Sequence, residues 1–176
     1  MQQETPLERQ QANQLLAVAA LARRAKSGGN NFYWIAGLSV VNSLISAFQG
    51  GITFVIGLGI TQLVDAFASV FAEQAPDSAL IFKGLGLALS IIISGISALF
   101  GFLAGKGLRW AFITGMVLYS LDTILLLIFT DWFGLAFHLF FLWGLWSGLQ
   151  ALNQLRKFST PASPPASGFP KDIGVS

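Results

Sequence analysis

Three ionisable side chains, Asp65, Asp122 and His138, lie well inside long apolar stretches of this chain. Carboxylates and imidazoles can exchange protons or coordinate cations, and such groups are costly in lipid unless they are shielded, paired or used. Two interpretations stay open: a proton- or cation-handling site, or a buried hydrogen-bond network that fixes helix packing. The full candidate polar cluster comprises Asn42, Gln62, Asp65, Asp122 and His138.

The distances of the three residues from the nearest polar breaks predict that they lie at one depth. Asp65 lies about two turns before Glu73, while Asp122 lies about two and a half turns before Asp131 and His138 about two turns after it. With a rise of about 1.5 Å per residue, these offsets place the three groups about 10 to 13 Å below one face of the membrane. The spacing therefore predicts a single polar layer.

Other kinds of chemistry are disfavoured by the residues present. The chain has no cysteine and one histidine, which leaves little basis for a metal site. Ser147 lies about 13 Å from His138 along the same helix, so the two form no catalytic dyad. Ile60 and Leu121 stand where intramembrane aspartyl proteases have an aspartate and a tyrosine. We therefore expect no enzymatic activity, no metal and no cofactor.

The composition places these residues in a membrane. Hydrophobic residues make up 54% of the chain and charged residues only 10%, whereas a soluble globular domain has about 25% charged residues. The charges gather at the ends and in short breaks, as they do between spanning helices. The net charge of +2 is too small to indicate nucleic acid, so the expected partner is the lipid bilayer.

Five apolar segments are each long enough, or nearly so, for the about 20 residues that a spanning helix needs. They cover residues 31–49, 52–72, 79–104, 109–130 and 132–154. The links between them are short, which favours antiparallel neighbours. We therefore predict an all-α fold, a polytopic transmembrane bundle of five apolar helices.

The placement of basic residues favours a different number of crossings. Eight of the ten basic residues decide the comparison: with five crossings, four of them fall on each side, and the positive-inside rule gives no orientation. With one net crossing between residues 31 and 72, all eight fall on one side, while Glu73, Asp77 and Asp131 fall on the other with Lys83 near them. One segment is then re-entrant or interfacial. We keep four crossings as the alternative. The eight basic residues are Arg9, Arg23, Arg24, Lys26, Lys106, Arg109, Arg156 and Lys157.

The chain divides into a transmembrane domain, residues 31–155, and two polar ends. Residues 1–30 are predicted to form an amphipathic cytoplasmic or interfacial helix. It begins with a capping box at Thr5–Glu8 and stops at Gly28-Gly29. Residues 156–176 are rich in proline and serine and are expected to be disordered.

Small residues at a spacing of four predict close helix packing, because they let backbones approach within lipid. The residues with this spacing are Ser97, Gly101 and Gly105, and also Gly144 and Gly148. These contacts lie inside the bundle or join copies of the chain, so a homo-oligomer or a larger membrane-protein complex stays open.

The five tryptophans fall into two groups. Trp34, Trp110 and Trp132 begin apolar segments, as an interfacial aromatic belt would have them. Trp143 and Trp146 lie deeper and are expected to pack inside the bundle.

Three runs in the second half of the chain resemble a family of small, uncharacterised multi-pass membrane proteins of bacteria. The runs are Arg109-Trp110-Ala111-Phe112, then Leu118-Tyr119 with Asp122, and Asp131-Trp132 with Ala136-Phe137-His138. The resemblance covers roughly residues 31–155 and implies a bacterial inner-membrane location without implying any chemistry.

Two functional classes fit these observations. The expected one is a non-catalytic structural or accessory subunit of a membrane assembly. The alternative is a small proton- or cation-linked transporter or channel that uses the Asp/His cluster. No inverted repeat of the kind common in transporters is detectable, which favours the first.

Overall fold

The computed structural model describes residues 5–49 and 57–159, and the structural statements below concern these residues. They are helical throughout apart from short links, and no strand occurs among them, which confirms the all-α prediction. The elements are α1 Pro6–Gln49, α2 Gly59–Gln74, the short 3₁₀ helix η1 Pro76–Ser78, α3 Ala79–Gly105, α4 Arg109–Ile128 and α5 Trp132–Ser159.

Four helices of the described part, α1, α3, α4 and α5, are long and apolar enough to cross a membrane. α2 has 16 residues, fewer than the about 20 that a crossing requires. The bundle thus contains five helices, as expected. Their lengths agree with the alternative of four crossings and one shorter segment.

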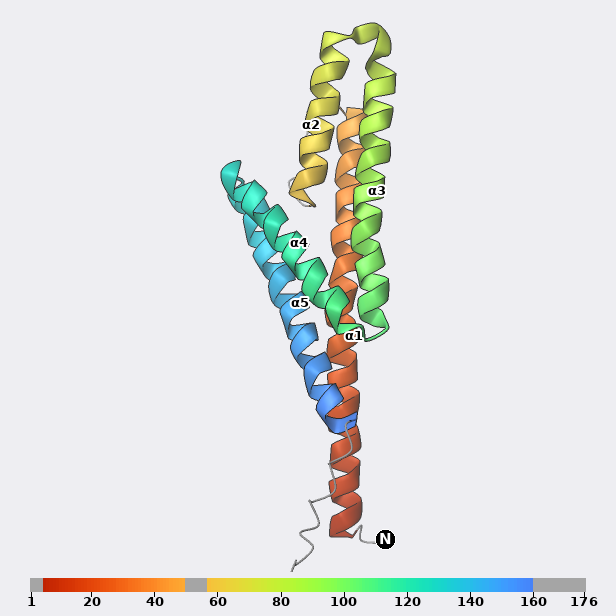
Figure 1. The fold of residues 1–176 in the computed structure, drawn as a ribbon, viewed down its shortest axis with the longest axis vertical. Helices are drawn as coiled ribbons and strands as arrows, with labels where there is room; N and C mark the ends of the chain where they lie inside the picture. The colour runs from red at the N-terminus through yellow and green to blue at the C-terminus, as the bar shows by residue number, and fades with distance from the viewer. Residues whose placement is uncertain (1–4, 50–56, 160–176) are drawn as a thin grey trace, which may run out of the picture.

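The directions of the helices place most basic residues at one end of the bundle and several acidic residues at the other. α1 and α2 run the same way along the bundle, with α2 starting part-way along, and α3, α4 and α5 then alternate (Figure 1). The start of α1, the α3–α4 turn and the end of α5 therefore share one end, which carries eight of the ten basic residues of the chain. Glu73, Asp77 and Asp131 lie at or near the turns at the opposite end, together with Lys83 near the start of α3. We call the first the basic end.

The predicted stop at Gly28-Gly29 is wrong, because α1 continues through it as one helix of 44 residues. A Cβ on Gly28 would collide with the backbone of Gly148 in α5, and one on Gly29 would come 3.3 Å from the Cβ of Ala104 in α3. A helical glycine costs about 1 kcal/mol relative to alanine. Close packing against α5 and α3 offsets that cost. The two glycines therefore permit close contacts between helices and do not end α1.

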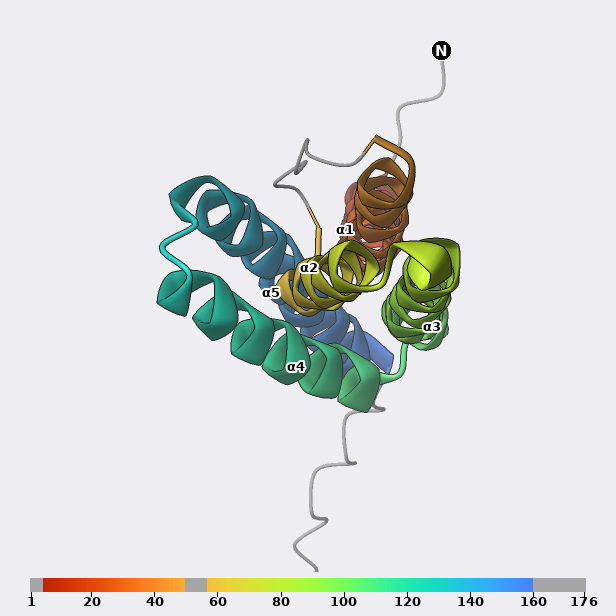
Figure 2. The ribbon, with the colours of Figure 1, turned by 90° about the horizontal axis from the view of Figure 1, so that it is seen from above.

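α1 is the element that the others are built around. It packs against α3 on one side and α5 on the other, α2 lies along α3, and α4 pairs with α5. Viewed down the long axis, α2 lies near the middle, between α3 and α4 (Figure 2). The core is formed by buried side chains that include Phe32, Ile35, Phe112, Tyr119 and Leu145.

The small residues with spacing four lie mainly at helix contacts. Ser97 donates a hydrogen bond to the carbonyl of Phe32 at 3.2 Å, and a Cβ on Gly101 would come 3.1 Å from the ring of Tyr33. Gly148 faces Gly28 and Gly144 faces Asn31, whereas a Cβ on Gly105 would meet nothing within 4 Å. The side-chain position of Gly105 is therefore open, although its backbone nitrogen would lie 3.5 Å from a Cβ on Gly29.

The two deeper tryptophans do not pack inside. Trp143 is 68% exposed and Trp146 is 54% exposed, so both face outward from α5. The expectation of internal packing is wrong because Gly144, Leu145 and Gly148 occupy the inward positions of that helix instead.

Candidate functional site

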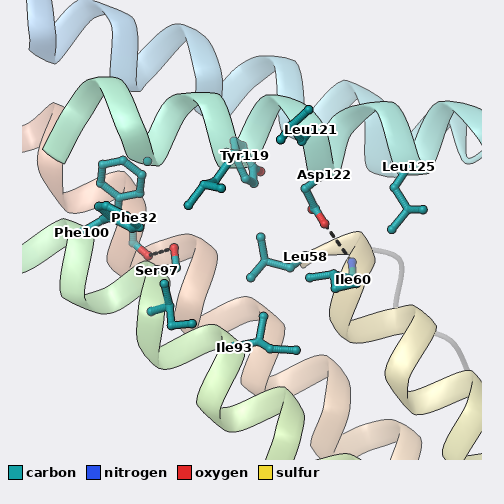
Figure 3. A pocket seen from close by; sticks show the side chains of 13 residues that line it. Phe32, Leu58, Ile60, Ile93, Ser97, Phe100, Tyr119, Leu121, Asp122 and Leu125 are labelled. Carbon is teal, nitrogen blue, oxygen red and sulfur yellow. Dashed lines mark hydrogen bonds between the residues drawn. The ribbon is translucent and has the colours of Figure 1, made fainter. Parts of the chain in front are cut away.

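The carboxylate of Asp122, in α4, binds the first turn of α2. Its Oδ2 accepts a hydrogen bond from the backbone N–H of Gly59 at 2.8 Å. Its Oδ1 accepts one from the backbone N–H of Ile60 at 2.8 Å, which is drawn as a dashed line in Figure 3. The first N–H groups of a helix have no partner within it and form the positive end of its dipole. α2 has no capping side chain of its own at Leu58, so Asp122 supplies the cap from a different helix.

His138, in α5, contacts the same carboxylate. Its Nε2 lies 2.8 Å from Oδ2 of Asp122, and its Nδ1 lies 2.9 Å from the carbonyl oxygen of Gly134. The imidazole is 1% exposed and stacks on the ring of Tyr119, with 4.4 Å between the ring centroids. Three helices thus meet at one buried polar pair.

The contacts of His138 fix where the protons lie. A carbonyl oxygen can only accept a hydrogen bond, so Nδ1 carries a hydrogen, and the Nε2–Oδ2 bond needs one further proton. The carboxyl group of Asp122 and the imidazole of His138 therefore share one proton in the Nε2–Oδ2 hydrogen bond.

Asp65, in the middle of α2, has different partners. The hydroxyl of Ser43 in α1 donates to its Oδ2 at 2.6 Å, and the hydroxyl of Ser90 in α3 donates to its Oδ1 at 2.9 Å. Asp65 is 7% exposed and shares a small cleft with Lys83, but the two form no ion pair in the described part of the chain. This acid joins α2 to α1 and α3.

The predicted single layer is therefore two separate sites. Asp122 and His138 are in direct contact, whereas Asp65 hydrogen-bonds to neither of them and lies about 9 Å farther along α2 from Gly59. The depth argument failed because it placed both polar turns at one level. The α2–α3 turn extends farther along the long axis than the α4–α5 turn (Figure 1).

The other two members of the predicted cluster, Asn42 and Gln62, each have one buried polar atom without a hydrogen-bond partner among the described residues. Oδ1 of Asn42 and Nε2 of Gln62 have no hydrogen-bond partner among the described residues, and the same holds for the hydroxyl of Ser94. Neither residue bonds to Asp65, Asp122 or His138 in this part of the chain. Gln62 lies one turn before Asp65, and Asn42 is next to Ser43 in the chain, but neither side chain belongs to either site.

Sequence analysis missed the hydroxyl partners of the acids. Ser39 accepts a hydrogen bond from Leu58 N–H at 2.7 Å and donates to the Ile35 carbonyl at 2.8 Å, which holds the entry to α2 against α1. Ser39 and Ser43 lie four residues apart in an apolar segment, and Ser90 lies in another. Serines at helical spacing inside apolar segments are the pattern that would have identified them.

A cavity of about 420 Å³ opens beside Asp122 between α3 and α4. Phe32, Phe100 and Ile93 line one part of it, and Leu121 and Leu125 line the other (Figure 3). Its wall is almost entirely apolar, and Asp122 and Tyr119 supply the polar groups together with Ser97. Within the described residues, no three His, Asp or Glu side chains come together as metal ligands.

Comparisons with known proteins leave the function to be argued from this geometry. No family model, no curated protein and no solved structure matches the chain.

Proposed function

We propose that this chain is a non-catalytic structural or accessory subunit of a membrane assembly in the bacterial inner membrane. One observation carries the proposal: both carboxylates buried in the bundle have each of their oxygens hydrogen-bonded to neighbouring helices. Asp65 joins α2 to α1 and α3, and Asp122 joins α2 to α4 and α5. Groups used in this way hold a short helix in place.

The first part of α1 supports a role in an assembly. It projects beyond the bundle at the basic end (Figure 1), and every side chain from Pro6 to Ala17 is exposed. Leu15 and Leu16 are 71% and 68% exposed. Because α1 has no break at Gly28-Gly29, this arm is rigidly continuous with a membrane-spanning helix, so a partner bound to it is held at a fixed height above the membrane.

The size of the native assembly tests this proposal. Membranes solubilised in mild detergent are run on native gels with the wild-type chain and with L15E/L16E. We expect a complex well above the mass of the single chain, and its loss in the variant. The matched control is Q10E/Q11E, which adds the same charge to the same exposed arm and should leave the complex intact. A wild-type chain that migrates alone contradicts the proposal.

The cavity beside Asp122 favours a second candidate, a proton-linked transporter. The Asp122–His138 pair holds one proton, and Asp122 lines a 420 Å³ space between α3 and α4. Purified protein in liposomes separates the two functions. Proton flux that is lost in D122N while the helical content is retained supports transport, whereas no flux under any imposed gradient supports the structural role.

A further inference from the structure

A second, polar cleft lies on the opposite side of α1 from the α3 contact, between α1 and α5. It has a volume of about 220 Å³. The α1 side supplies the polar residues Arg24, Ser27 and Asn31, and the α5 side supplies the aromatic residues Phe140 and Trp143 together with the hydroxyl of Ser147. Neither the buried acids nor the apolar cavity belongs to this cleft, and the proposed function does not use it.

The guanidinium of Arg24 is held in place by one hydrogen bond, and its remaining donors have no partner among the described residues. Its Nε donates a hydrogen bond to Oγ of Ser147 at 2.7 Å, which holds the side chain across the cleft. Its two terminal nitrogens have no hydrogen-bond acceptor in the described ranges, and no acidic residue there pairs with it. A planar guanidinium with its outer N–H groups unpaired is suited to bind phosphate in a bidentate manner.

Two further polar side chains line the cleft from α1. Ser27 lies three residues after Arg24, and Asn31 lies four residues after Ser27, so the three side chains lie along one face of the helix. Neither Ser27 nor Asn31 forms a side-chain hydrogen bond among the described residues. Asn31 fits against α5 because Gly144 has no side chain there, and a Cβ at that position would collide with its amide nitrogen.

The aromatic wall gives the cleft a second chemical character. Phe140 is 60% exposed and Trp143 is 68% exposed, on adjacent turns of α5 next to Ser147. These side chains project outward from a helix that is long and apolar enough to cross the membrane. Indole rings with apolar surroundings on one side and polar groups on the other are favoured at the level of lipid headgroups.

The position of the cleft agrees with a lipid ligand. Arg24 belongs to the basic end, where the positive-inside rule predicts the cytoplasmic leaflet with its anionic lipids. Basic clefts between spanning helices on that side bind anionic headgroups. We propose that the α1–α5 cleft binds the phosphate of an anionic phospholipid, with Arg24, Ser27 and Asn31 contacting the headgroup and Phe140 and Trp143 contacting the acyl chains.

Native mass spectrometry with added lipid tests this site. The purified full chain is titrated with phosphatidylglycerol and, separately, with phosphatidylcholine of the same acyl chains. We expect a saturable first phosphatidylglycerol and weaker binding of phosphatidylcholine. R24Q should lower the apparent affinity for phosphatidylglycerol by about tenfold, the effect of losing one charged hydrogen-bonding group. R23Q is the matched control, because Arg23 carries the same charge one position away, is exposed and lies outside the cleft.

Each other outcome of this titration contradicts the proposal. Equal binding of the two lipids, or an equal loss in R23Q and R24Q, would show that net charge alone attracts the lipid. Displacement of the lipid by inorganic phosphate would show a site for the free anion. Should R24Q fail to give a folded protein, N31L provides the second test, since it keeps the charge and should lower phosphatidylglycerol binding while leaving the thermal transition unchanged.

Discussion

Asp122 and His138 lie on successive helices and meet through a 2.8 Å contact between Oδ2 and Nε2 inside the bundle. Each member also bonds to backbone: Asp122 to the N–H groups that begin α2, and His138 to the carbonyl of Gly134. The pair therefore connects α4, α5 and the start of α2. Its disruption should affect three helices together.

A double-mutant cycle on this pair should show strong coupling. Leaving one member of a buried hydrogen-bonded pair without its partner costs about 1 to 3 kcal/mol, so D122N and H138Q should each lower the unfolding free energy by about that amount. The double variant should lose much less than the sum, because neither member is then left without its partner. Denaturant unfolding in detergent, followed by circular dichroism, measures the four free energies. Additive losses would contradict the direct pairing.

The serine partners of Asp65 provide an independent test of how α2 is held. S43A and S90A each remove one hydrogen bond to a buried carboxylate and should each destabilise the fold by about 1.5 to 3 kcal/mol. S120A is the matched control, because Ser120 is exposed and bonds only to the carbonyl of Met116 one turn earlier. Equal unfolding free energies for S90A and S120A would contradict a role for Asp65 in attaching α2 to α3.

Some of this architecture follows from sequence and some does not. The apolar segments predict the helices, and the eight basic residues favour four crossings, since both depend on local composition. The partners of Asp122 are beyond such reasoning, because they are backbone N–H groups of Gly59 and Ile60, which every residue except proline possesses.

The Gly28-Gly29 motif is a second feature whose structural role cannot be predicted from the local sequence. A glycine pair after a helical stretch is typical of a C-terminal stop, and it is equally suited to a close helix crossing. Only the presence of Gly148 on α5 decides between the two. That information is 120 residues away in the chain and is not contained in the local pattern.

The effect of a glycine-to-alanine substitution on the unfolding free energy should therefore depend on whether that glycine lies at a helix contact. G148A places a methyl group against the backbone of Gly28, at 2.6 Å from its Cα, and should cost about 1 to 3 kcal/mol. G95A is the matched control in α3, since a Cβ there meets nothing within 4 Å. Its unfolding free energy should equal that of the wild type or exceed it slightly. Thermal unfolding of both variants in one detergent gives the comparison.

The start of α1 should respond to acid. Glu8 accepts hydrogen bonds from the backbone N–H of Thr5 at 2.7 Å and from its hydroxyl at 2.9 Å, and these bonds lower the pKa of the Glu8 carboxyl. The cap therefore stabilises the helix end fully at pH values above the ordinary pKa of glutamate, which is about 4. This stabilisation is lost as the pH falls through the lowered pKa of Glu8. Backbone chemical shifts of Thr5 should follow this titration, and those of E8Q should not.

Single cysteines distinguish four crossings from five, because the natural chain has none. If α2 does not cross, Arg9 and Lys106 lie on the same side of the membrane, and Asp77 and Asp131 lie on the other. R9C and K106C should then react with an impermeant maleimide from one face of sealed vesicles, and D77C and D131C from the opposite face. Five crossings place Arg9 opposite Lys106, so labelling of R9C and K106C from different faces would show that α2 and the residues before it traverse the bilayer.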